Sequence, residues 1–360
     1  MKPYRKIDSS EPAYLRLYKR MRDEIVRGTY TFGEKLPSKR VTAAENGLST
    51  VTVEHAYALL CDEGYAEARQ RSGYIVVFRS EDGFVPAFEE RSRPAFTLAR
   101  ADEPDAFPFT VLTRTMRAVI TEYGEKILGT SPNMGNAELR HALSRYLEKS
   151  RGIKASPEQI VIGSGSEYLY GLIVGLLGRD RVYAIESPSY RMIEQVYLAS
   201  GAAYEKLPLC AGGIDSSALR ASRADVLHIT PYRSFPSGIT ATASKRHEYL
   251  RWAEAPGRYL VEDDFESEFS VLTKPEETLF SLAKADNILY LNTFTRTISP
   301  SLRIGYLILP KHLIADYQKQ YGAYACTVST YMQLVLARLI TSGDFERHIN
   351  RVRRRKRKPL

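Results

Sequence analysis

The sequence predicts two domains: a small N-terminal winged helix-turn-helix domain and a larger α/β domain with a mostly parallel sheet. At 360 residues, the chain is too long for one ordinary domain. Residues 1–78 show helical periodicity followed by a hairpin pattern, whereas residues 107–360 alternate between apolar strand-like runs and helical stretches. Residues 79–106 show neither pattern and collect prolines among acids and arginines, which predicts a linker between the domains.

Composition restricts the class of protein. Apolar residues make up 44% of the chain and charged residues 26%, as in a soluble globular protein. The sequence has neither an uninterrupted apolar run of membrane-spanning length nor an N-terminal signal pattern, so we expect a cytoplasmic protein with no membrane partner. The three cysteines lack paired spacing, which predicts reduced thiols and neither disulfides nor a metal site.

The net charge of +9 is concentrated at one end of the chain. Residues 347–358 contain eight arginines and lysines and no acid, so the rest of the chain is nearly neutral. Nucleic-acid binding must therefore be argued from the residue pattern and not from the bulk charge. The basic segment is typical of the start of a helix, and a solvated arm that touches DNA is the alternative.

Three amphipathic helices are predicted in the first domain. The first runs over residues 14–28, where apolar side chains recur at helical spacing. Ser38 is the predicted cap of a short second helix, which carries Val41 and Ala44 into the core. Ser49 is the predicted cap of the third helix. The buried stripe of that third helix is predicted to be Val53, Ala56, Tyr57 and Leu60.

The second and third helices form a helix-turn-helix pair, which a hairpin follows. The exposed first turn of the third helix presents residues 50–52, which are small enough for a helix that enters a DNA major groove. Two strand-like runs flank residues 70–73, which predicts a wing with a basic tip that can lie against phosphates. The predicted DNA-contacting residues are Ser38, Lys39, Arg40, Ser49, Thr50, Thr52, Arg71 and Gly73. The alternative for Lys39, Arg40 and Arg71 is that they are ordinary solvated charges.

The order of these motifs resembles the GntR-type DNA-binding domain. Residues 33–40 read Gly-Glu-Lys-Leu-Pro-Ser-Lys-Arg and residues 49–53 read Ser-Thr-Val-Thr-Val, while Glu-Gly-Tyr at 63–65 and Ser-Gly at 72–73 match the end of the family's long helix and its wing. The resemblance implies that double-stranded DNA is the partner. That family has an arginine at the position of Thr50, so this chain lacks a long cationic side chain usually aimed at DNA.

In the larger domain, polar motifs follow several predicted strands. The predicted strands are 160–162, 181–185, 226–229, 258–261, 288–291 and 306–309. In an open α/β sheet the ligand crevice lies at the carboxyl ends of the strands. Residues 163–166 offer backbone amides to an anion, although they equally suit a tight turn. Tyr190 is suited either to stacking on a flat ligand or to packing at the rim, and Asp263 either to holding a protonated ring nitrogen or to capping a helix.

One loop lies between the last two predicted strands. Residues 293–306 read Thr-Phe-Thr-Arg-Thr-Ile-Ser-Pro-Ser-Leu-Arg-Ile-Gly-Tyr. With the preceding motifs, this loop resembles the fold-type I aminotransferase domain of pyridoxal-phosphate enzymes. In that family a lysine at the position of Arg296 forms a Schiff base with the cofactor.

The resemblance also implies roles for other residues. Asp263 would face the pyridine nitrogen and Tyr190 would stack on the ring. The phosphate would be served by Ser164, Gly165, Ser166 and Arg303. Phe265 stands where the family usually has a tyrosine, and Arg233 and Ser234 replace its usual His-Gln pair.

Arg296 decides the expected chemistry. An arginine side chain stays protonated at any accessible pH and its charge is delocalised, so it cannot attack an aldehyde as a lysine amine does. We therefore expect no covalent pyridoxal phosphate and no transamination, with the cofactor bound at most noncovalently.

A GntR-like domain joined to an aminotransferase-like domain resembles the MocR-type transcriptional regulators. The resemblance implies pyridoxal phosphate, a small amine or amino-acid effector, and a homodimer. Family members continue into a C-terminal subdomain, so we expect residues 107–360 to be a C-terminally truncated effector and dimerisation domain. The sequence thus predicts a DNA-binding regulator with a catalytically inactive sensor domain. The alternatives are a pyridoxal-phosphate-dependent aminotransferase and a decayed, truncated regulator that only dimerises.

Overall fold

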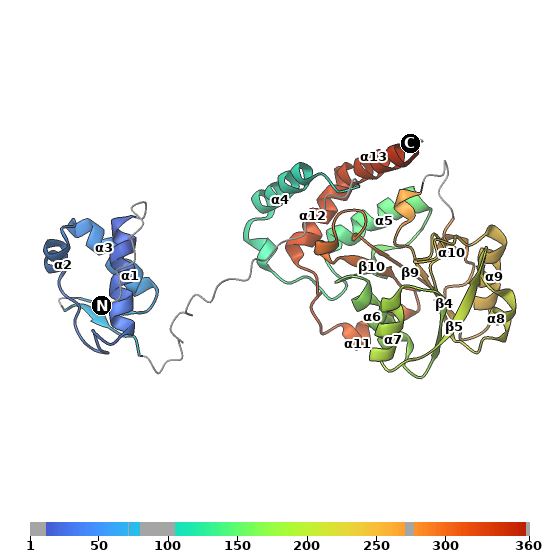
Figure 1. The fold of residues 1–360 in the computed structure, drawn as a ribbon, viewed down its shortest axis with the longest axis horizontal. Helices are drawn as coiled ribbons and strands as arrows, with labels where there is room; N and C mark the ends of the chain where they lie inside the picture. Colours follow the sequence, from blue (N-terminus) through green and yellow to red (C-terminus); the bar gives the residue numbers. More distant parts are fainter. Residues whose placement is uncertain (1–11, 71, 80–104, 271–276, 358–360) are drawn as a thin grey trace. The chain divides into compact units, whose positions relative to one another are not determined.

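The computed structural model describes residues 12–70, 72–79, 105–270 and 277–357. The chain divides into two compact units, Met1–Ala99 and Arg100–Leu360, each with its own hydrophobic core (Figure 1). Most of the linker expected at residues 79–106, and the wing residue Arg71, lie outside the described residues.

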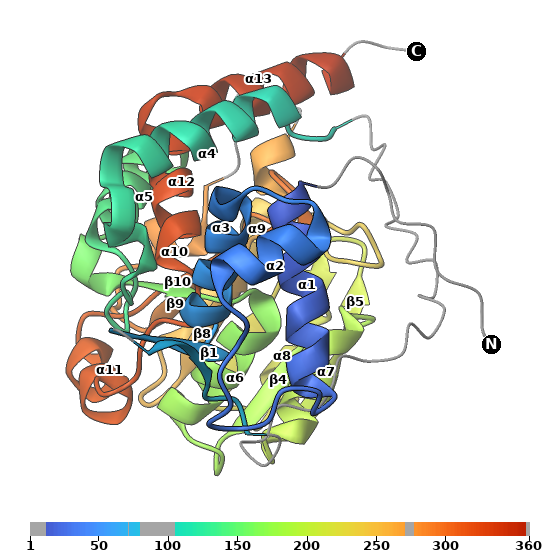
Figure 2. The same ribbon diagram turned by 90° about the vertical axis from the view of Figure 1, so that its left-hand side faces the viewer.

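The smaller unit is a winged helix-turn-helix, as the sequence predicts. Its helices are α1 (Ala13–Val26), α2 (Lys39–Asn46) and α3 (Thr50–Asp62) (Figure 2). Strands β1 (Ala66–Arg69) and β2 (Gly73–Val76) pair antiparallel and form the wing. One core joins the buried faces of α1 and α3, with Leu17, Tyr18, Met21, Ile25, Val53, Ala56, Tyr57 and Leu60, while Tyr14 of the predicted α1 stripe is only partly buried.

Helix α2 turns a different face to the core from the one its apolar spacing predicts. Val41 is 47% exposed and Ala44 is also exposed, whereas Thr42 and Ala43 are buried. Thr42 points inward because its hydroxyl shares a hydrogen bond of 2.8 Å with the buried Tyr57 hydroxyl of α3. A polar side chain with a buried partner sets the rotation of this helix, and the prediction for Val41 and Ala44 is wrong.

The larger unit is built on an eight-stranded, mostly parallel sheet, as predicted. Across the sheet the strand order is β3-β10-β9-β8-β7-β4-β5-β6. The strands are β3 (Ile160–Gly163), β4 (Val182–Ser187), β5 (Ala203–Cys210), β6 (Gly213–Ile214), β7 (Val226–Ile229), β8 (Tyr259–Asp263), β9 (Ile288–Thr293) and β10 (Gly305–Ile308). Strand β10 lies antiparallel between β9 and β3, and β6 pairs antiparallel with β5, while the other pairs are parallel.

Strands β5 and β6 at one edge were not among the predicted strands. In β5, Leu207 is the fully buried side chain, and its neighbours are partly or fully exposed. The segment therefore lacks the continuous apolar run by which the central strands were recognised.

Helices cover both faces of the sheet. On one face, α4 (Phe109–Tyr123), α5 (Ala137–Arg151), α12 (Thr330–Thr341) and α13 (Asp344–Arg357) share a core with β3, β9 and β10 (Figure 1). On the other face lie α6 (Ser166–Leu177), α7 (Arg191–Ala199) and α11 (Leu313–Tyr321). Helices α8 (Ser216–Ala221), α9 (Ala243–Ala253) and α10 (Leu279–Leu282) pack around β7 and β8. Four short 3₁₀ helices are η1 (Gly124–Leu128), η2 (Pro157–Gln159), η3 (Ser267–Phe269) and η4 (Pro300–Leu302).

Most of the basic segment belongs to helix α13. Phe345, His348, Ile349 and Val352 are buried on one side of this helix, so it is an integral helix of the domain and not a solvated arm. None of the described helices combines the length and apolar character that a membrane span requires.

Candidate functional site

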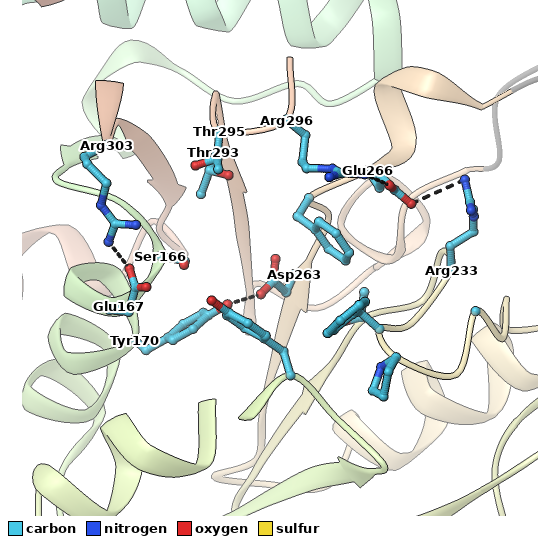
Figure 3. Close-up of a pocket in the computed structure, with 16 residues that line it drawn as sticks. Ser166, Glu167, Tyr170, Arg233, Asp263, Glu266, Thr293, Thr295, Arg296 and Arg303 are labelled. Atoms are coloured by element: carbon cyan, nitrogen blue, oxygen red, sulfur yellow. Dashed lines mark hydrogen bonds and ion pairs between the residues drawn. The ribbon is translucent and has the colours of Figure 1, made fainter. Parts of the chain in front are cut away.

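A cavity of about 480 Å³ lies where β7, β8 and β9 end (Figure 3). That volume suits a small-molecule ligand. The cavity is lined by Ser166, Glu167, Tyr170, Tyr190, Thr230, Arg233, Phe235, Pro236, Gly238, Asp263, Phe265, Glu266, Thr293, Thr295, Arg296 and Arg303.

Asp263, the last residue of β8, forms the buried floor of the cavity and is 3% exposed. Its Oδ2 accepts a hydrogen bond of 2.5 Å from the Tyr170 hydroxyl, and the Nε2 of His228 lies 3.6 Å from the same oxygen. Burial and the neighbouring carboxylate raise the pKa of Tyr170 well above its ordinary value, so the phenol keeps the proton that it donates. Within the described residues, the other oxygen, Oδ1, is buried without a hydrogen-bond partner.

Glu167 neutralises one of the cavity's arginines. It lies in the first turn of α6, and its carboxylate accepts a hydrogen bond from the Arg303 guanidinium (Figure 3). That guanidinium lies against the backbone of Gly165, where an added β-carbon would be 3.1 Å from Nη2. The side chains of Glu167 and Arg303 are 25% and 51% exposed, so water reaches the pair only in part.

Glu266 holds the other two arginines from the opposite side of the cavity (Figure 3). Its Oε1 lies 2.8 Å from Nη2 of Arg296, and its Oε2 lies 3.4 Å from Nη1 of Arg233. The Glu266 side chain is 10% exposed, whereas both guanidiniums are about half exposed. The residue at the expected Schiff-base position is thus an ion-paired cation.

The backbone is strained at two of these arginines. Arg233 and Arg303 have φ angles of 50° and 49°, and they are the two non-glycine residues of the described segments with φ in the left-handed region. Such conformations cost roughly 1–3 kcal/mol and persist where the surrounding structure holds them, most often at functional sites. Strain at two cavity residues supports a ligand-binding role for the cavity.

Buried Glu186 supports the loop that carries Arg233. Its Oε2 accepts hydrogen bonds from the Ser234 hydroxyl at 2.5 Å and from the Thr230 amide at 3.2 Å. Burial raises the pKa of Glu186 to about 8, although both donors oppose that shift. The carboxyl group is therefore protonated near neutral pH.

The structure brings together some of the residues predicted for a cofactor. Ser166, Tyr190, Asp263 and Arg303 line the cavity, whereas Ser164 and Gly165 do not. Three further lining residues, Glu167, Tyr170 and Glu266, were not predicted from the sequence. Glu167 directly follows the Ser-Gly-Ser motif and Glu266 directly follows Phe265. An acidic residue next to a predicted ligand-binding motif could have marked both as candidates.

The cavity fits one half of pyridoxal phosphate. The partnerless, buried Oδ1 of Asp263 suits the protonated nitrogen of a pyridine ring, which is a hydrogen-bond donor. The phosphate half does not fit, because the Glu167 carboxylate already occupies Arg303 at the start of α6. Among the described residues, the lining of this cavity contains no lysine whose amine could react with the group.

In the smaller unit, the predicted DNA-contacting serines cap the two helices of the helix-turn-helix. The hydroxyl of Ser38 accepts from the Val41 amide at 3.3 Å, and that of Ser49 accepts from the Thr52 amide at 3.1 Å. Thr50 is exposed at the start of α3, while the Thr52 hydroxyl bonds to Ser49 at 2.8 Å. The hydroxyls of Ser38, Ser49 and Thr52 thus already form hydrogen bonds within the protein.

Cations flank these caps. Arg40 is exposed on α2, whereas Lys39 Nζ lies 2.6 Å from a carboxylate oxygen of Glu54. Lys35, which the sequence argument did not single out, lies beside the wing, since a β-carbon on Gly73 would be 3.1 Å from Lys35 Cε. Lys35 lies inside the motif at residues 33–40, and this position could have marked it as a DNA-contact candidate.

Each of the two units matches a known protein family. Residues 13–76 match the family of bacterial regulatory proteins, gntR family, and residues 103–358 match aminotransferase class I and II. The uncharacterized HTH-type transcriptional regulator YdeL of Bacillus subtilis is 30% identical over 96% of this chain and 77% of its own length. The probable rhizopine catabolism regulatory protein MocR of Rhizobium meliloti is 28% identical over 96% of this chain and 75% of its own.

Among solved structures, a kynurenine aminotransferase of Pyrococcus horikoshii, crystallised with PMP, superposes with a TM-score of 0.62 at 25% identity. The match covers 70% of this chain and 65% of that enzyme, so this chain spans a little under two thirds of the enzyme's length. The larger unit therefore has the fold of the fold-type I aminotransferases, a family that normally binds pyridoxal phosphate.

A GntR winged helix joined in one chain to an aminotransferase-like domain defines a class of DNA-binding transcriptional regulator. The chain belongs to that class, the MocR-type HTH transcriptional regulators.

Proposed function

We propose that this regulator senses a small amine or amino-acid effector in its aminotransferase-like domain and does not catalyse amino-group transfer. One observation carries the proposal: Arg296, at the expected Schiff-base position, is a guanidinium paired with Glu266 at 2.8 Å. A guanidinium is neither a nucleophile nor a base near neutral pH. Pyridoxal phosphate binds at most noncovalently.

The absorption spectrum tests this chemistry. Purified full-length chain mixed with excess pyridoxal phosphate and then dialysed is expected to show no visible band that borohydride bleaches, because the described lining of the cavity contains no lysine amine to form the Schiff base. An aminotransferase with its lysine, treated in parallel, supplies the positive control. A yellow, reducible adduct on this chain would show that another lysine forms the Schiff base, and amino-group exchange between an amine and a keto acid would show that the chain is an enzyme.

The regulator acts in the cytoplasm as a homodimer on double-stranded DNA, where Ser38, Lys39, Arg40, Ser49, Thr50, Thr52, Arg71 and Gly73 form the contact surface. Exposed Arg40 and the serine-capped starts of α2 and α3 support this assignment. A cation and helix N-termini both suit phosphate oxygens.

Replacing Arg40 with alanine is expected to weaken DNA binding roughly 3- to 10-fold near 0.1 M salt, and to reduce the slope of log affinity against log salt by about 1, because one phosphate contact is lost. A gel-shift titration against salt measures both quantities. Arg20→Ala is the matched control, since Arg20 is an exposed arginine on α1 that pairs with Glu24. If Arg40→Ala and the wild type bind DNA with equal affinity, Arg40 does not belong to the DNA-contact surface.

The same gel-shift titration tests whether the chain binds DNA with any sequence preference. A wild-type chain that shows no preference for any upstream DNA over random duplex, even at low salt, would instead be a regulator that has lost DNA reading and only dimerises.

A further inference from the structure

The cavity's cationic groups already have carboxylate partners within the chain. Arg303 pairs with Glu167, and Arg296 and Arg233 both pair with Glu266. An incoming anion would have to displace one of these carboxylates or lie beside it. The cavity is therefore poorly suited to a ligand that carries a phosphate.

The buried group left without a partner in the cavity is an acceptor. Asp263 is 3% exposed, and its Oδ2 is held by Tyr170 at 2.5 Å. Its Oδ1 has no hydrogen-bond partner in the described part of the chain and points into the cavity (Figure 3). A buried carboxylate oxygen is stabilised most by a charged N–H donor.

The walls near this acceptor are aromatic. Tyr190 and Phe235 are 37% and 55% exposed, and their rings meet edge to face with centroids 6.2 Å apart. Phe265 adds a third ring to the lining. Large exposed rings beside a carboxylate suit a flat cation, which gains both stacking and charge.

We infer that the cavity selects a protonated nitrogen heteroaromatic compound without a phosphate group, and that Glu167 is the residue that rejects the phosphorylated form. The ring N–H donates to Asp263 Oδ1, and the ring lies among Tyr190, Phe235 and Phe265. Glu167 supplies, from within the protein, the negative charge that a phosphate would otherwise bring to Arg303 and the start of α6. This inference rests on the proposed sensing role of the cavity and names the class of effector.

Calorimetric titration with a matched pair of ligands tests it. Pyridoxine and pyridoxine 5′-phosphate share one ring, differ by the phosphate, and lack the aldehyde needed for a Schiff base. The full-length wild type is expected to bind pyridoxine at least about 10-fold more tightly than its phosphate ester. Glu167→Gln is expected to remove most of that preference by gaining at least about 10-fold for the ester, while its affinity for pyridoxine changes less than about 3-fold.

Two further variants complete the experiment. Asp263→Asn is expected to weaken pyridoxine binding about 10-fold or more, and an unchanged thermal melt shows that the variant is folded. Glu122→Gln removes an exposed carboxylate paired with Arg338 outside the cavity lining, and it should leave both affinities unchanged.

Several results would overturn the inference. These are equal or tighter binding of the ester by the wild type, an unchanged preference in Glu167→Gln, and failure of the wild type to bind either compound. The proposed function fails separately, through a reducible adduct with pyridoxal phosphate or through loss of DNA reading. Neither of those results depends on the ratio of the two affinities.

Discussion

Replacing Arg151 with methionine is expected to lower the free energy of unfolding of the larger unit by about 3–5 kcal/mol. Arg151 Nη2 lies 2.8 Å from Asp264 Oδ2, and the two side chains are 4% and 3% exposed. Removing the guanidinium leaves the Asp264 carboxylate buried, with the Tyr290 hydroxyl at 2.7 Å but without its ion-pair partner. Burial of a carboxylate that has lost its counterion is strongly unfavourable.

Urea unfolding followed by fluorescence measures this loss. The chain has one tryptophan, Trp252, which is 7% exposed within the larger unit, so its signal reports on that unit. Arg338→Met is the control, because the Arg338–Glu122 pair is 44% and 45% exposed and should be worth at most about 1 kcal/mol. Similar losses in the two variants would contradict the argument from burial.

A double replacement sharpens the test. Within the described residues, Nε and Nη1 of Arg151 are buried without hydrogen-bond partners. The attraction between Arg151 and Asp264 therefore does not fully offset the free-energy cost of removing both charges from water. Arg151→Met combined with Asp264→Leu should therefore recover much of the stability that Arg151→Met alone loses.

Replacing Glu186 with glutamine is expected to stabilise the protein at pH 8.5 by up to about 5 kcal/mol and to change its stability little near pH 4.5. Burial raises the pKa of Glu186 from its ordinary 4.5 to about 8. Between these values the folded chain holds a proton that the unfolded chain releases, so the unfolding free energy of the wild type falls as pH rises. Glutamine keeps an acceptor for the Thr230 amide and has no proton to lose.

The measurement compares urea unfolding of Glu186→Gln and wild type at pH 4.5 and pH 8.5, again through Trp252. Burial also raises the pKa of Glu262 to about 8, but Glu262 is present in both proteins and cancels in the comparison. Glu122→Gln serves as the exposed control. A stability difference that is the same at both pH values would show that Glu186 does not carry the expected proton.

The sequence predicts the fold well wherever burial leaves a local pattern. The α1 and α3 stripes and the central strands are apolar runs whose side chains are buried in the structure. The two wrong or missing predictions each have an identifiable cause. The rotation of α2 depends on the bond between Thr42 and Tyr57, which are 15 residues apart, and β5 lies near the sheet edge, where most of its side chains are exposed.

The cavity could be predicted in outline but not in its electrostatics. Family resemblance drew attention to Asp263, Tyr190, Ser166 and Arg303, and all four line one cavity. The carboxylates that pair with its arginines directly follow two predicted motifs, but the sequence does not show which arginine each one pairs with. Glu167 and Arg303 are separated by 136 residues and Glu266 and Arg296 by 30, so only the folded sheet brings each pair together.

The position of Glu266 has a consequence for any amine introduced into this loop. A lysine introduced at position 296 by a single change would find a carboxylate ready to hold its ammonium form, and a protonated amine has no lone pair to offer. A lysine at position 296 is therefore expected to be a poor nucleophile unless Glu266 is also replaced.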